Sequence, residues 1–221
     1  MLEKLAKNKK KDKETDLSKQ IVIVNNIDGA GNRADEIRTI NLYSDITEKV
    51  CAEAVSALFY FKDTAVTYEL KDPDNPDSEV IGISKPVSLV ISTFGGSATD
   101  MFSVYDTMRM TKEVCDINTI GMGKVMSAGV LLLAAGTKGK RKIGANCRGM
   151  IHGVAGGFGG TLTTMENEIE EIKWIQEKYI SCLAAETNLT VKRLKKMIRR
   201  QVDVYLSAEQ AVEFGIADEI I

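Results

Sequence analysis

Three side chains in this sequence have the types that nucleophilic hydrolysis requires. Ser127 stands among small residues at the start of an apolar run, and His152 is the single histidine of the chain. A serine hydroxyl becomes a good nucleophile when a base accepts its proton, and imidazole is the commonest base. An acid must orient the imidazole, and Asp203 suits that role because it precedes a capped helix and stands outside any run of charges. The pattern predicts a hydrolase with serine, histidine and aspartate in that order.

Backbone amides near Ser127 could stabilise the negative charge that such a reaction develops. The amide that follows a serine in the first turn of a helix points out of the helix end, where the helix dipole favours negative charge. Gly95 and Gly96 close a neighbouring strand, and without side chains their backbone can come within hydrogen-bond range of a carbonyl oxygen. These two features predict an oxyanion hole.

Each of these residues also has an ordinary structural interpretation. Ser127 could be a small residue that allows close helix packing, His152 a core or surface residue, and Asp203 a solvated charge or a cap. The glycine-rich residues 156–160 could form a phosphate cradle, but no lysine follows and the next helix begins with threonines. Residue types alone leave the catalytic and the structural interpretations open.

The composition is that of a globular protein without a strong preference for charged partners. The 221 residues are 44% hydrophobic and 27% charged, with a net charge of −2. Such a small net charge gives no reason to expect that the molecule as a whole attracts nucleic acid or membranes. No apolar run reaches the roughly 18 to 20 residues of a membrane span and no secretory leader is visible, so we expect a cytoplasmic protein. The four cysteines are widely spaced, so we expect core residues and no metal site.

Residues 1–17 differ from the rest of the chain because they hold six lysines between Lys4 and Lys13 and few apolar residues. Such a segment cannot repay its ordering entropy, so we expect a flexible tail followed by one domain over residues 18–221. A basic arm for nucleic acid is the alternative. Interleaved acidic residues and the lack of aromatic residues for stacking argue against it.

Strands and helices alternate along the rest of the chain, which is the βαβ pattern of an α/β protein. A loop with two prolines is predicted at residues 71–79. Strands are predicted at residues 20–26, 38–44, 86–93, 117–123, 149–152 and 217–221, and helices at residues 46–62, 98–112, 127–136, 161–187, 190–200 and 207–215.

The helix at residues 161–187 is longer than a small core needs. Trp174, Ile175 and Ile180 lie beyond its main apolar stripe, which predicts that the helix packs a second face against another subunit. The stripe itself consists of Met165, Ile169, Ile172, Tyr179 and Leu183.

From about residue 38 to the C-terminus the chain resembles the ClpP family, the proteolytic subunits of the Clp protease. The motifs that carry this resemblance are the glycine-pair turn and helix at 92–110, the nucleophile segment at 123–141, the histidine strand at 150–160 and the acid segment at 203–218. Carried over by position, the resemblance implies Ser127 as nucleophile, His152 as general base and Asp203 as orienting acid. It implies the backbone amides of Gly96 and Ala128 as the oxyanion hole.

The resemblance also implies a fold and an assembly. The fold is the spiral of ββα units shared by ClpP and the crotonases, and residues 163–186 would be the protruding handle through which two seven-membered rings stack. The active sites would lie inside the barrel, where a serine endopeptidase cleaves unfolded or captured polypeptides through an acyl-enzyme. An AAA+ unfoldase of the Clp type would consume ATP, and the peptidase itself would need no cofactor.

Several positions depart from the family pattern. Phe94 replaces the usual proline before the glycines, and residues 69–86 look like an insertion. Ser88, Lys142 and Gly144 stand where the unfoldase-docking pocket commonly has larger apolar residues. Such divergence suits a virus-encoded or accessory member, for example one that acts in capsid maturation.

Three other functions are also compatible with the sequence. The first is a non-catalytic ring subunit that keeps the fold for assembly. The second is a crotonase-like acyl-CoA enzyme, which shares the fold and the oxyanion hole. The third is a membrane-associated peptidase in which Lys124 would act as the base for Ser127.

Overall fold

The computed structural model describes residues 37–157, 159–199 and 202–221. The predicted tail at residues 1–17 and the predicted strand at residues 20–26 lie outside the described residues.

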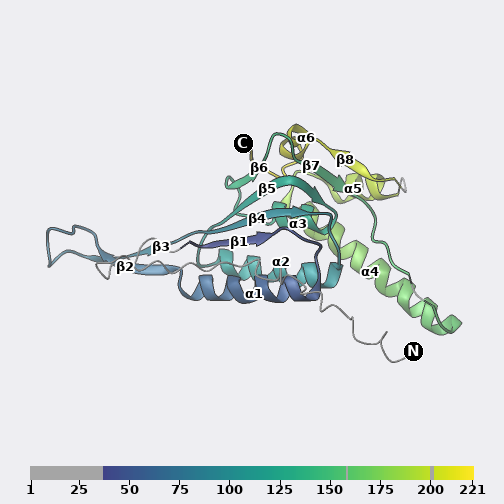
Figure 1. Ribbon diagram of the computed structural model, residues 1–221, viewed down its shortest axis with the longest axis horizontal. Coiled ribbons are helices and arrows are strands. Elements are labelled where there is room, and N and C mark those ends of the chain that lie inside the picture. Colours follow the sequence, from purple (N-terminus) through teal and green to yellow (C-terminus); the bar gives the residue numbers. More distant parts are fainter. Residues whose placement is uncertain (1–36, 158, 200–201) are drawn as a thin grey trace, which may run out of the picture.

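A mostly parallel sheet forms the centre of the molecule (Figure 1). Its main path of parallel neighbours is β1 (Thr39–Leu42), β4 (Val87–Thr93), β5 (Ile117–Met126), β6 (Arg141–Ile143) and β9 (Glu219–Ile220). The first half of β5 pairs with β6, whereas its second half pairs with β7 (Arg148–Ile151), and β8 (Val204–Leu206) adds to β7 in antiparallel direction. The predicted α/β fold is confirmed.

Helices cover the faces of this sheet because its strands are buried on both sides. β4 has the β-branched sequence VSLVIST, and five of its seven residues are buried. α1 (Glu48–Asp63) and α2 (Ala98–Lys112) pack against each other below the sheet in the view of Figure 1. α3 (Ala128–Ala134) is buried along its whole length, which explains its apolar sequence. All four cysteines are free, and three of them are buried.

Capping side chains and a glycine mark the ends of two helices, α2 and α6 (Ala208–Glu213), close to the predicted positions. α2 spans the predicted range, and the Ser97 side chain caps its first turn. α6 begins with a capping box, in which the side chains of Ser207 and Gln210 each accept the other's backbone N–H. Gly215, with φ of 70°, follows the end of this helix.

A β-hairpin surrounds the predicted loop, and its strands lie where no element is predicted from the sequence. β2 (Val66–Leu70) and β3 (Val80–Ser84) pair in antiparallel direction, and residues 71–79 connect them. The hairpin projects from one end of the molecule in Figure 1. Val66, Tyr68 and Val80 share one face, and all three are exposed. The loop prediction is correct for residues 71–79 but misses the two flanking strands.

The long helix α4 (Leu162–Glu186) packs on the domain only near its C-terminal end. Its buried residues are Tyr179, Ile180 and Leu183, whereas Ile169 and Trp174 are 43% and 54% exposed. Figure 1 shows the N-terminal half of α4 extending away from the sheet.

Within the predicted stripe this chain buries Tyr179 and Leu183 fully, and it leaves Met165 and Ile172 half-buried. The prediction that Ile180 faces another subunit is wrong, because Ile180 is 1% exposed in the core of this domain. Within the described ranges, no helix has the length and apolar character to cross a membrane.

A basic helix follows α4. α5 (Val191–Ile198) buries Leu194, and its Lys195 forms a 2.7 Å ion pair with Glu177 of α4.

A buried guanidinium ties together the ends of several elements. Arg141 is 4% exposed, and its Nε and Nη2 donate to the Asp218 carboxylate at 2.9 and 2.6 Å. Its Nη1 donates to the carbonyls of Ala134 and Glu186, which end α3 and α4. The hydrogen bonds from Arg141 lower the pKa of Asp218.

We predict that Asp218→Ala lowers the free energy of unfolding by about 3 kcal/mol, because it leaves the buried Arg141 charge without its partner. Asp116→Ala, which removes the exposed partner of Lys140, should cost less than about 1 kcal/mol. Urea unfolding at neutral pH measures both values. Equal losses in the two variants would contradict the assignment.

The same ion pair should make stability depend on acid. A lowered pKa means that Asp218 contributes its full stabilisation above the ordinary aspartate pKa of about 4 and loses it as the pH falls through the lowered value. The wild type should therefore lose more stability below about pH 4 than Asp218→Ala does.

Candidate active site

Ser127 occupies a strained turn between β5 and α3. Its φ and ψ are 53° and −119°, and it is the one non-glycine residue with positive φ in the described part of the chain. Its N–H donates to the carbonyl of Met150 at 2.8 Å, which extends the β5–β7 pairing by one residue. Such strain persists only where the surrounding structure holds it, and it is common at active sites. A sharp strand-to-helix turn also exposes the serine hydroxyl.

Glycines allow the neighbouring turn to approach Ser127 closely. A Cβ placed on Gly95, whose φ is 104°, would lie 2.6 Å from the Cβ of Ser127. A Cβ on Gly129 would lie 2.6 Å from a methyl carbon of Thr93. Both contacts are shorter than side chains tolerate. The close packing therefore occurs in the same turn that brings the half-buried Ser127 to the wall of a cavity.

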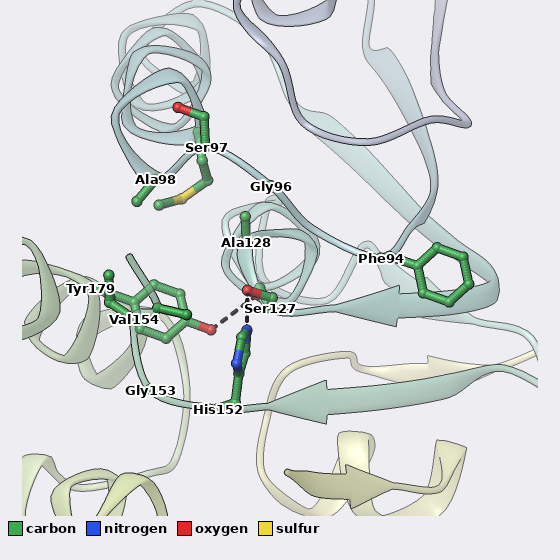
Figure 2. A pocket seen from close by; sticks show the side chains of 12 residues that line it. Phe94, Gly96, Ser97, Ala98, Ser127, Ala128, His152, Gly153, Val154 and Tyr179 are labelled. Carbon is green, nitrogen blue, oxygen red and sulfur yellow. Dashed lines mark hydrogen bonds between the residues drawn. The ribbon is translucent and has the colours of Figure 1, made fainter. Parts of the chain in front are cut away.

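His152 follows β7 and reaches the hydroxyl of Ser127. Its Nε2 lies 2.7 Å from Ser127 Oγ, and Figure 2 shows this hydrogen bond as a dashed line. When the imidazole carries its proton on Nδ1, Nε2 accepts the hydrogen bond from the serine hydroxyl. The structure thus brings together the two residues that the sequence singles out as nucleophile and base.

Asp203 lines the same cavity as His152 without a hydrogen bond between them in the described residues. It is exposed, directly before β8, and lines a small cavity together with His152, Gly153 and Gln176. Among the described residues, no hydrogen bond joins its carboxylate to the imidazole. The role of Asp203 as the orienting acid remains a prediction.

The amides of Gly96 and Ala128 border the cavity in front of Ser127. This cavity has a volume of about 430 Å³, and both residues line it with Ser127 and His152 (Figure 2). Ala128 begins α3, so its N–H has no partner within the helix. The turn around Gly96 is held by Ile46, which donates to the Gly95 carbonyl and accepts from the Ser97 N–H. Within the described ranges, neither amide donates a hydrogen bond to another protein group.

Tyr179 is a site residue that the sequence places only in the apolar stripe of a helix. Its hydroxyl donates to the carbonyl of Ser127 at 3.0 Å (Figure 2). The side chain is buried, and burial raises its pKa. A buried tyrosine hydroxyl needs a partner, which is the one sequence signal available for this contact.

The family model described as Clp protease matches residues 79–221. The chain belongs to the Clp protease family. The match covers all five residues predicted for the site, and the mixed α/β fold with its parallel sheet is consistent with the ClpP fold. Clp proteases hydrolyse peptide bonds, usually through a serine, and generally assemble into rings.

Lys124, which is the alternative base considered in the sequence analysis, contacts the ring of Phe94 in this Clp protease. Its Nζ lies over the ring of Phe94, 4.7 Å from the ring centre, while His152 contacts the Ser127 hydroxyl. In the described residues the Ser127 hydroxyl therefore contacts His152 and not Lys124, and the family is one of peptidases rather than of acyl-CoA enzymes. In the part of the chain that the structure describes, no three metal-binding side chains cluster together.

We predict that Gly95→Ala displaces Ser127 and slows its labelling by a fluorophosphonate probe at least about tenfold, because the added Cβ would collide with the serine. Gly139→Ala is the matched control, since Gly139 also has positive φ, 84°, but its Cβ would meet nothing within 4 Å. Circular dichroism should show both variants folded. Wild-type labelling in Gly95→Ala would contradict the packing argument.

Proposed function

We propose that this chain is a serine endopeptidase that cleaves unfolded or captured polypeptides inside an oligomeric barrel. Membership of the Clp protease family supplies the reaction class. The observation that supports this site most directly is the 2.7 Å contact between His152 Nε2 and Ser127 Oγ at a strained strand-to-helix turn.

The proposed reaction begins when Ser127 Oγ attacks the scissile carbonyl carbon and its proton passes to His152 Nε2. The carbonyl oxygen becomes an oxyanion, which the N–H groups of Gly96 and Ala128 stabilise. His152 then gives the proton to the leaving amine, and an acyl-enzyme remains. In the second half, water attacks the ester with His152 as base, and the acid product leaves as Ser127 recovers its proton.

Asp203 is proposed to orient the imidazole through Nδ1 and to stabilise its protonated form. Its position beside the His152 cavity supports this role. Hydrogen bonds among catalytic groups are often long in a free enzyme and tighten when substrate binds. We therefore expect the carboxylate to approach His152 in the complex.

The proposed substrate is an extended peptide lying along residues 153–157, directly after His152. This segment forms no helix or strand of its own, and Gly153 and Val154 line the cavity in front of Ser127. A peptide that adds as a strand is held by main-chain hydrogen bonds, so its cleavage depends little on its sequence. Selectivity would then come from access to the barrel, which an AAA+ unfoldase of the Clp type would control with ATP.

The alternative is a non-catalytic ring subunit. The lack of a bond between Asp203 and His152 in the described residues is the observation that favours it.

We predict that Ser127→Ala and His152→Ala each abolish fluorophosphonate labelling and lower peptide hydrolysis at least about 10³-fold, because they remove the nucleophile and its base. Asp203→Asn should lower hydrolysis less severely, and Lys124→Met should leave labelling close to wild type. A fluorogenic peptide and intact-protein mass spectrometry provide the readouts. A folded wild type that never labels at Ser127 would favour the non-catalytic subunit.

The exposed half of α4 is the proposed contact between rings. Ile169 and Trp174 are large apolar side chains on a helix that projects from the domain. Burying such a surface is the expected reason for its composition.

We predict that Ile169→Glu combined with Trp174→Glu halves the native mass, because the rings no longer stack. Lys173→Glu changes the charge of the same exposed helix face without removing apolar surface, and it should retain the wild-type mass. Native mass spectrometry measures the assembly. An unchanged mass in the double variant would show that α4 does not hold the rings together.

A further inference from the structure

The carbonyl of Ser127 accepts two hydrogen bonds from different parts of the chain. One comes from the N–H of Val130 in the first turn of α3, at 3.0 Å. The other comes from the hydroxyl of Tyr179 on α4, also at 3.0 Å. A carbonyl oxygen has two lone pairs, so these donors use its full capacity. The hydrogen bond from Tyr179 has no role in the proposed reaction.

The carbonyl of Ser127 belongs to the same peptide unit as the N–H of Ala128. A trans peptide is planar, and its C=O and N–H point in opposite directions. Any group that holds the Ser127 oxygen therefore also sets the direction of the Ala128 N–H. The Tyr179 hydroxyl lies on the oxygen side of this unit, and Ala128 lines the cavity in front of Ser127.

A second hydrogen bond to the Ser127 carbonyl also makes the Ala128 N–H a stronger hydrogen-bond donor. Hydrogen bonds in a chain polarise one another, so an amide whose oxygen accepts a bond becomes a better donor through its nitrogen. The hydroxyl of Tyr179 is buried, where such electrostatic effects are stronger than in water.

The backbone of Ser127 requires support on both sides because its φ of 53° is strained. The N–H of Ser127 is held by the carbonyl of Met150. Its carbonyl is held by Tyr179 and Val130. Removal of the tyrosine hydroxyl leaves the Val130 bond in place, so α3 should still form while the peptide unit gains freedom.

We propose that Tyr179 is a positioning residue that aims and strengthens the Ala128 N–H toward the oxyanion of the transition state. This inference rests on the proposed peptidase function. An oxyanion donor acts more strongly on the transition state than on bound substrate. Loss of the hydroxyl should therefore lower kcat and leave KM nearly unchanged. A tyrosine that merely fills the core or the cavity wall would not produce this pattern.

The test compares Tyr179→Phe with Tyr105→Phe. Tyr105 is a matched control because it is 3% exposed and its hydroxyl donates to Glu186 at 3.0 Å, on α4 but away from Ser127. Each variant is assayed for kcat and KM on a fluorogenic peptide. Each is also titrated with a peptide aldehyde, which adds to the serine as a tetrahedral oxyanion, and with the corresponding unreactive peptide alcohol.

For Tyr179→Phe we expect kcat to fall about three- to tenfold, the range for loss of one neutral hydrogen bond. Affinity for the aldehyde should fall by the same factor, with KM and the affinity for the alcohol within about twofold of wild type. Tyr105→Phe should match wild type in all four quantities. Replacement of Tyr179 by p-aminophenylalanine, which retains a donor at that position, should restore most of kcat and provides a second variant if Tyr179→Phe folds poorly.

Two results would overturn the inference while the proposed function stands. The first is an active Tyr179→Phe with unchanged kcat and aldehyde affinity. The second is a variant in which only KM rises, because this indicates a role in the cavity wall. A wild type that neither labels at Ser127 nor cleaves peptide would overturn the proposed function and this inference together, so the two failures are distinguishable.

Discussion

The backbone of one residue, Ser127, is the constraint on which the rest of the site depends. Its positive φ is unfavourable for any residue with a side chain, so it exists only because neighbouring elements hold it from several directions. The branching of β5 toward β7 supplies the carbonyl of Met150, and the long helix supplies Tyr179. The glycine turn after β4 leaves room for the serine itself. The sheet, the glycine turn and the protruding helix α4 therefore all help to hold the backbone of Ser127 in this conformation.

Sequence reasoning predicted those parts of the fold whose signals are local. The bounds of α2 follow from a capping serine and an apolar face, and the capping box at Ser207 follows from its spacing to Gln210. The contact between Ser127 and His152 was predictable for a chemical reason, since a serine nucleophile needs a base and the chain contains one histidine. The alternation of strands and helices predicted the sheet but not the branch at β5.

The features that sequence reasoning missed depend on contacts between distant residues. Apolar and polar residues alternate in β2, VTYEL, but neither strand of the β2–β3 hairpin has a buried face, and the two prolines between the strands favour a loop. Tyr179 matches the apolar spacing of a helix, and the destination of its hydroxyl is visible only in three dimensions. The distance between Asp203 and His152 likewise depends on how α5 and β8 are connected, which spacing along the chain does not determine.

The close approaches of the glycines have an evolutionary consequence. A single methyl group would meet Ser127 if added to Gly95, the carbonyl of Ile46 if added to Gly96, and Thr93 if added to Gly129. None of these contacts involves α4. One codon change at Gly95 or Gly96 could therefore silence the proposed chemistry at the turn without touching α4. After gene duplication, a copy of this chain could lose the proposed activity in one mutational step and keep its fold. Under the proposed ring assembly, rings that mix active and inactive copies would then be open to selection.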